Sequence, residues 1–150
     1  MLLKQKIFED LKAAMKAGET ERRDVLRMLD SMIKNTEIDK LKKEEGLGDE
    51  EVMDVIARAI KQRKDAASQF ETGGRPELAE KEMKEVEILK AYMPEQMSED
   101  KVREIVKEVI AQAGATSKAE IGKVMGPAMG RLKGQADGNL VKKIVEEELQ

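Results

Sequence analysis

Residues 91–114 read AYMPEQMSEDKVREIVKEVIAQAG and contain both a boundary and one complete helix. Pro94 ends the helix before it, because the residue preceding a proline disfavours the α conformation. Ser98 is spaced to cap the next helix, whose apolar residues recur every three or four positions until Gly114 ends it. The same period runs through the rest of the chain without sustained alternation, so the sequence predicts an all-α protein.

Four helices are predicted before this boundary. The first ends at Gly18, and the second is expected to run on to Glu45, just before a pair of glycines. The GGRP break at residues 73–76 separates the third helix from the fourth, with its proline suited to a first helical position. We therefore expect residues 1–93 to form an N-terminal helical bundle of about four helices.

Three helices are predicted after the boundary. Ser117 and Glu120 are spaced as a capping box, which predicts that a helix begins at Lys118. Asp137 is spaced to cap the last helix. Residues 94–150 are thus expected to form a smaller C-terminal three-helix domain.

Composition excludes several kinds of chemistry. The 150 residues include no Cys and no His, and the net charge is −3. Thiol nucleophiles, disulfide partners, zinc fingers and histidine relays are therefore excluded, and we expect no metal and no cofactor. The sequence has no apolar run long enough to predict a membrane-spanning helix. Charged residues are spread through residues 1–16, so no apolar stretch of signal-peptide length is predicted there. We expect a soluble cytoplasmic protein with no membrane partner.

Residues 118–134, KAEIGKVMGPAMGRLKG, hold glycines at a strict period of four. The four glycines are Gly122, Gly126, Gly130 and Gly134. Each glycine inside a helix costs up to about 1 kcal/mol relative to alanine, so several in one helix require a reason. On a helical wheel they share one side, and the apolar residues lie mostly on the other.

Two interpretations of this glycine stripe remain open. Residues 118–143 carry six basic residues against two acidic ones, and lysines flank the stripe, so a sugar-phosphate backbone could approach closely. Alternatively, the glycines allow close packing against another helix. Pro127 weakens the helical-wheel argument because it can kink or split the helix.

The chain is identified as similar to the GatB/YqeY family over essentially its whole length. The matching stretches are LRML at 26–29, IKQRKDA at 60–66, GGRPELAEKE at 73–82, YMPEQMS at 92–98, IGKVMG at 121–126 and KGQADG at 133–138. One departure is small: Met93 stands where the family more often has leucine, a swap that packing tolerates.

The resemblance implies an N-terminal helical bundle and a smaller C-terminal domain similar to the tail of the GatB subunit of tRNA-dependent amidotransferase. In that enzyme the tail helps to hold tRNA, so the partner expected here is tRNA, contacted through its backbone, or an aminoacyl-tRNA-related protein complex. The candidate nucleic-acid-binding residues are Lys118, Gly122, Lys123, Gly126, Lys133, Gly134, Gly138, Lys142 and Lys143. The family label is a carbon–nitrogen ligase with glutamine as amido donor.

The residues themselves do not support a complete amidotransferase. A glutamine amidase needs a nucleophile, but Cys is absent and the four serines lie outside any glycine-rich amidase-like stretch. No P-loop pattern is present either. We therefore expect no catalytic residue and an accessory role, with two alternatives. These are a helical protein-interaction adaptor that does not bind RNA, and an amide-transfer enzyme that works only inside a larger complex.

A second basic cluster lies around the break between the third and the fourth predicted helices. It comprises Lys61, Arg63, Lys64 and Arg75. With Glu82 and Glu85 nearby in sequence, the main interpretation is buried ion pairs between two helices. The alternative is an anion site, to which the start of the fourth helix would add backbone N–H donors.

Overall fold

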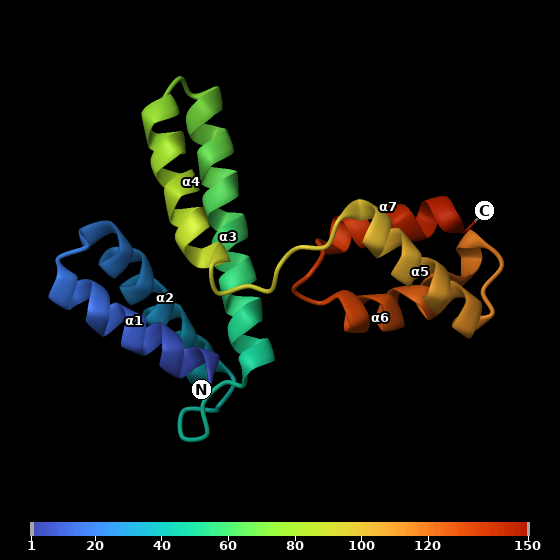
Figure 1. The fold of residues 1–150 in the computed structure, drawn as a ribbon, viewed down its shortest axis with the longest axis horizontal. Coiled ribbons are helices and arrows are strands. Elements are labelled where there is room, and N and C mark those ends of the chain that lie inside the picture. Colours follow the sequence, from blue (N-terminus) through green and yellow to red (C-terminus); the bar gives the residue numbers. More distant parts are fainter. Residues whose placement is uncertain (1, 150) are drawn as a thin grey trace. The chain divides into compact units, whose positions relative to one another are not determined.

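The computed structural model describes residues 2–149, and this range contains seven α-helices and no strand, which confirms the all-α prediction (Figure 1). The helices are α1 (Leu3–Ala17), α2 (Thr20–Asp39), α3 (Asp49–Thr72), α4 (Pro76–Lys90), α5 (Glu99–Ala113), α6 (Ile121–Leu132) and α7 (Gly138–Glu148). The chain divides into two compact units, Met1–Met93 and Pro94–Gln150. Across residues 2–149, no helix has the length and apolar character needed to cross a membrane.

The first unit is built from two helical pairs. α1 lies beside α2, and α3 lies beside α4 (Figure 1). Their apolar stripes meet in one core formed by Ile7, Leu11, Val25, Leu26, Leu29, Ile33, Leu47, Val52, Val55, Ile56, Ala59, Leu89 and Tyr92. Each fully buried aliphatic side chain contributes about 1.5–3 kcal/mol, so this core holds the four helices together.

The prediction that the second helix runs on to Glu45 is wrong, because α2 ends in a Schellman motif. The Leu41 amide donates to the Ile38 carbonyl at 3.1 Å. The Lys42 amide donates to the Glu37 carbonyl at 2.7 Å. Leu41 has φ +56°, in a position where this motif usually carries glycine. The missing glycine is the reason that the sequence pattern did not reveal the helix end.

The second unit is a three-helix core of α5, α6 and α7, which all contact one another. Its buried members are Val102, Val106, Val109, Ala115, Val124, Ala128, Leu132, Val141, Ile144, Val145 and Leu149. Two predicted caps are confirmed. Ser98 Oγ accepts from the Lys101 amide at 3.3 Å, and Asp137 Oδ1 accepts from the Asn139 amide at 2.8 Å.

The predicted capping box before α6 is wrong. Residues Lys118–Glu120 form a 3₁₀ turn, and no hydrogen bond from an amide to the Ser117 side chain caps it. Instead the Thr116 hydroxyl and Glu120 Oε1 lie 3.3 Å apart and are hydrogen-bonded. The Glu120 carboxylate is thus hydrogen-bonded to Thr116 and does not form the predicted capping box with Ser117. The helix α6 begins only at Ile121.

Candidate functional site

Three of the four glycines of the stripe, Gly122, Gly126 and Gly130, lie on α6, which stays helical through Pro127. The side of α6 that packs into the core carries Val124, Ala128 and Leu132, all fully buried. These three residues recur at a spacing of four, as the glycines do, but lie on the other side of the helix. One side of α6 therefore carries buried aliphatic side chains, and the other side carries three glycines, which have no side chain.

The glycine side of α6 is open. Gly122, Gly126 and Gly130 are exposed, and a Cβ built on any of them would meet no heavy atom within 4 Å. Close packing against another helix of the second unit, within residues 94–149, therefore does not account for these three glycines. We call Gly122, Gly126 and Gly130 the open glycine face. The site residues predicted from the sequence do not include Gly130, although it shares the period of four with the others.

Of the two other predicted site glycines, Gly134 is explained by its backbone conformation, and Gly138 lies beside α6. Gly134 has φ +79°, a left-handed conformation that favours glycine, and its carbonyl accepts from Gln96 Nε2 at 2.9 Å. Gly138 begins α7, and a Cβ on it would lie 3.6 Å from Met129 Cε of α6. Gly134 thus has a structural reason that needs no ligand, whereas the contact at Gly138 is an ordinary van der Waals contact that does not require glycine.

Lysines lie at both ends of the open glycine face. Lys118 is exposed in the 3₁₀ turn before α6, and Lys133 is exposed directly after it. Lys123 lies next to Gly122, with its Nζ 3.5 Å from Glu120 Oε2 and its side chain 67% exposed. An exposed pair of this kind is weak and screened by salt, so Lys123 can exchange its carboxylate partner for a phosphate.

The two lysines of α7 lie on different sides of that helix. Lys142 is exposed and follows Gly138 by one turn. Lys143 precedes Glu147 by one turn, and Glu147 is bonded to Arg103 of α5 at 2.6 Å. The Arg103 guanidinium, with a smaller effect from Lys143, lowers the pKa of Glu147. Lys143 therefore lies near the pair that Glu147 of α7 makes with Arg103 of α5.

The basic cluster around the third break forms an ion pair at one position only. Arg63 is 8% exposed, and its Nε lies 3.3 Å from Glu85 Oε2, which confirms the interpretation of an ion pair between α3 and α4. Burial, together with the nearby Glu85 carboxylate, raises the pKa of Glu82. Lys61, Lys64 and Arg75 are exposed and do not join this pair.

The fold and this site define a class of small all-α proteins with an open, lysine-flanked glycine helix in the C-terminal unit. The chain belongs to the family described as Yqey-like protein, whose model matches residues 4–149. This confirms the resemblance identified from the sequence motifs.

Curated relatives match only part of the chain. It is 42% identical over 84 residues to "Altered inheritance of mitochondria protein 41, mitochondrial" from Kluyveromyces lactis, covering 56% of this chain and 44% of the relative. The protein of the same name from Lachancea thermotolerans is 40% identical over 85 residues, covering 57% and 44%. The chain thus matches less than half the length of these relatives.

These names correct one expectation. We expected a cytoplasmic protein, but the relatives are named as mitochondrial proteins, so the cytoplasmic assignment is wrong. The absence of cysteine and a mild net charge could not distinguish one reducing compartment from another.

Proposed function

We propose that this chain is a non-catalytic accessory factor that holds tRNA through its sugar-phosphate backbone, along the open glycine face. The observation that carries the proposal is that Gly122, Gly126 and Gly130 are exposed with no atom near their missing side chains. Three such glycines destabilise α6 by about 0.5–1 kcal/mol each. Within the second unit, residues 94–149, no neighbouring helix packs closely against these glycines, so a partner that approaches the backbone closely would explain why glycine stands at all three positions.

Phosphates suit this surface better than bases do. Lys118, Lys123 and Lys133 are exposed around the glycines and supply cations for phosphate oxygens. The three aromatic residues of the chain, Phe8, Phe70 and Tyr92, all precede residue 94, so the second unit has no ring on which a base could stack. Binding should therefore depend steeply on salt and weakly on sequence.

The hydrogen bonds of several Ser and Thr hydroxyl groups also support an accessory role. Ser98 Oγ caps α5, and Ser31 Oγ donates to the Arg27 carbonyl at 3.2 Å. Thr36 and Thr72 likewise donate to carbonyls of their own helices. These four hydroxyls serve local helix geometry, which supports an accessory role over a catalytic one.

The test is binding of the purified full chain to bulk tRNA, measured by fluorescence anisotropy across a salt series. We expect affinity to fall linearly on logarithmic axes. The double variant Lys123→Glu/Lys133→Glu should weaken binding at least tenfold and reduce the salt slope by roughly 1 to 2. The matched control is Lys101→Glu/Lys107→Glu on α5, which makes the same change in net charge and should bind almost as the wild type does.

Two outcomes count against the proposal. An equal loss in the two double variants would show that only net charge matters. No binding at low salt would overturn tRNA recognition by this chain.

A second candidate function is a protein adaptor whose partner helix lies on the same glycines. Met125 and Met129 are half-buried on α6 beside the open glycine face, and methionines suit an adaptable contact. This function predicts binding to a protein that Gly126→Leu abolishes and that the Lys123→Glu/Lys133→Glu variant leaves intact.

A further inference from the structure

Lys133, one of the candidate binding residues, lies just outside the helix that carries the open glycine face. It follows α6 directly with φ −55° and ψ 126°, so its direction is set by an extended backbone and not by the helix. The chain then turns back on the end of α6. The Gln135 amide donates to the Leu132 carbonyl at 2.9 Å, and Gly134 takes the left-handed conformation. We call residues 133–136 the α6–α7 turn.

The segment before α5 holds the α6–α7 turn. Gln96 Nε2 donates to the Gly134 carbonyl at 2.9 Å, and the Met97 amide donates to the Gln135 carbonyl at 2.8 Å. Two successive residues of this segment thus bind two successive carbonyls of the turn. Gln96 and Gly134 are 38 positions apart in the sequence, so only the packing of the second unit brings them together.

These two contacts differ in what else holds the residue that donates. Met97 packs against the core of the second unit, and Ser98 beside it caps α5, so the backbone bond of Met97 is part of the fold. Gln96 is exposed, so burial of its side chain contributes little. Its amide also lies 3.4 Å from the Pro94 carbonyl, which is long for a hydrogen bond. The main contact of this side chain is therefore the hydrogen bond to Gly134.

Gly134 is the position in the turn at which such a hydrogen bond has most effect. Glycine has no Cβ, so steric contacts alone leave the orientation of its carbonyl open, and the bond from Gln96 selects one orientation. Because α6 and α7 are both fixed in the core, any rotation at Gly134 must be taken up by its neighbours in the turn, including Lys133. Loss of this bond would therefore let the Lys133 side chain point in several directions.

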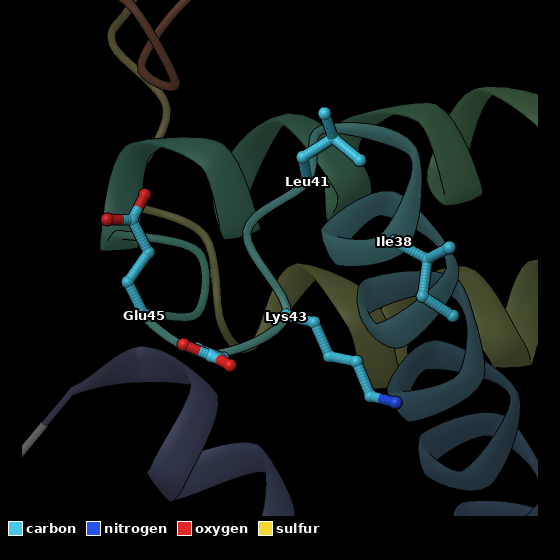
Figure 2. A pocket seen from close by; sticks show the side chains of 5 residues that line it. Ile38, Leu41, Lys43 and Glu45 are labelled. Carbon is cyan, nitrogen blue, oxygen red and sulfur yellow. The ribbon is translucent and has the colours of Figure 1, made fainter.

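The loop after α2, which borders a shallow groove, fixes a left-handed residue by different means (Figure 2). Leu41 has φ +56° there, and Lys40 and Lys42 on either side of it are bound to Glu51. Those two lysines hold their own loop. In the α6–α7 turn, the uncharged side chain of Gln96 has this role. The α6–α7 turn thus combines a neutral restraint with an exposed lysine.

We propose that Gln96 is a positioning residue for the nucleic-acid site. Its hydrogen bond to Gly134 fixes the α6–α7 turn and so directs Lys133 at a phosphate of the bound tRNA. A lysine whose backbone is fixed loses less conformational entropy on binding than one on a mobile turn. This inference rests on the proposed binding of tRNA and adds to it a residue outside the predicted site. Because Gln96 acts through the turn, its removal should affect binding only while Lys133 is present.

The first test uses the ¹⁵N-labelled full chain without ligand. We expect Gln96→Ala to lower the backbone order parameters of residues 133–136 from the rigid range, about 0.85, to about 0.6. The amides of α5, α6 and α7 should keep their wild-type values, and the melting temperature should not change, because Gln96 is exposed. Gln112→Ala is the matched control, since Gln112 is an exposed glutamine on α5, and it should leave the turn rigid. Unchanged order parameters in Gln96→Ala would overturn the proposal.

The second test measures binding to bulk tRNA by fluorescence anisotropy across a salt series. Gln96→Ala should bind about threefold to tenfold more weakly, with a salt slope lower by roughly 1, because one phosphate contact is lost. Gln112→Ala should bind as the wild type does. A double-mutant cycle then asks whether Gln96 acts through Lys133. In the Lys133→Ala background, Gln96→Ala should have no further effect on affinity.

Three results of the binding test would contradict the proposal, and they are distinguishable. Wild-type affinity in Gln96→Ala would overturn the positioning role and leave the proposed function intact. Additive losses for Gln96→Ala and Lys133→Ala would show that Gln96 affects binding independently of Lys133. No binding by the wild type would overturn the proposed function, and this inference with it.

Discussion

Tyr92 donates a 2.6 Å hydrogen bond from its hydroxyl to Asp10 Oδ2, and so ties the segment after α4 to α1. Tyr92 is 8% exposed and belongs to the core of the first unit, and Arg22 lies 3.6 Å from the same carboxylate oxygen. Burial, and then the Asp10 carboxylate, raises the pKa of Tyr92 to about 12. The hydroxyl is therefore held in its protonated form in the folded protein.

We predict that Tyr92→Phe destabilises the chain at pH 7 by about 1.5–3 kcal/mol, the usual contribution of a hydrogen bond to a charged group. Because the pKa is about 10 in the unfolded chain and about 12 in the folded one, the contribution is complete below pH 10 and is lost as the pH rises towards 12. Urea unfolding from pH 7 to pH 12 checks this. A difference between wild type and variant that does not change with pH would contradict it.

We predict that the contacts of the Glu51 carboxylate make the free energy of unfolding decrease at acidic pH. Hydrogen bonds from Lys42, then from the Gly48 amide and from Lys40, lower the pKa of Glu51 to about 2. A carboxylate with a lowered pKa stabilises the fold above its unfolded value, and that stability is lost as the pH falls from about 4.5 towards 2. Glu51→Gln should therefore be less stable than the wild type at pH 7 and equally stable near pH 2.

The control for this prediction is Glu50→Gln, an exposed carboxylate in the same first turn of α3. It removes one negative charge without touching the loop, so it should change stability much less at every pH. If the two variants behave alike, the effect comes from the N-terminus of α3 and not from the contacts of Glu51 with the loop.

We predict that alanine substitutions in the open glycine face stabilise the folded protein. Gly126→Ala and Gly130→Ala add a methyl group where nothing lies within 4 Å, so each is expected to raise the free energy of unfolding by about 0.5–1 kcal/mol. Gly134→Ala is the contrast, because its φ of +79° makes the same substitution destabilising. Denaturant unfolding of the three variants tests the geometry directly, independently of any ligand.

The ion pair of Arg63 with Glu85 should behave as a buried one. Removing one member in Arg63→Met leaves the Glu85 carboxylate without its partner and adds to the crowding of carboxylates at Glu82, so we expect a loss of about 3 kcal/mol. The double variant Arg63→Met/Glu85→Met removes both charges and should recover most of that loss. A double-mutant cycle by urea unfolding measures the coupling. Additive effects would mean that the pair is too solvated to matter.

Local patterns predicted much of the fold because helices are specified by local chemistry. The all-α class, the break at residues 73–76 and the caps Ser98 and Asp137 follow from short-range spacing, and the structure confirms each of them. The end of α2 could not be predicted, because a strained leucine stands where the local pattern calls for glycine. That conformation is held by Glu37 and Glu51, whose lysine partners lie elsewhere in the chain or around the loop.

The sequence by itself determined that this protein is helical, that one helix carries glycines at a period of four, and that cations flank them. Only the tertiary structure decided that Gly122, Gly126 and Gly130 have open space beside them within the second unit, that Gly134 adopts a left-handed conformation, and that Gly138 lies beside Met129 of α6. The physical reason is that a helical period fixes which residues share a side. Whether that side is covered depends on how α5 and α7 pack against the opposite one.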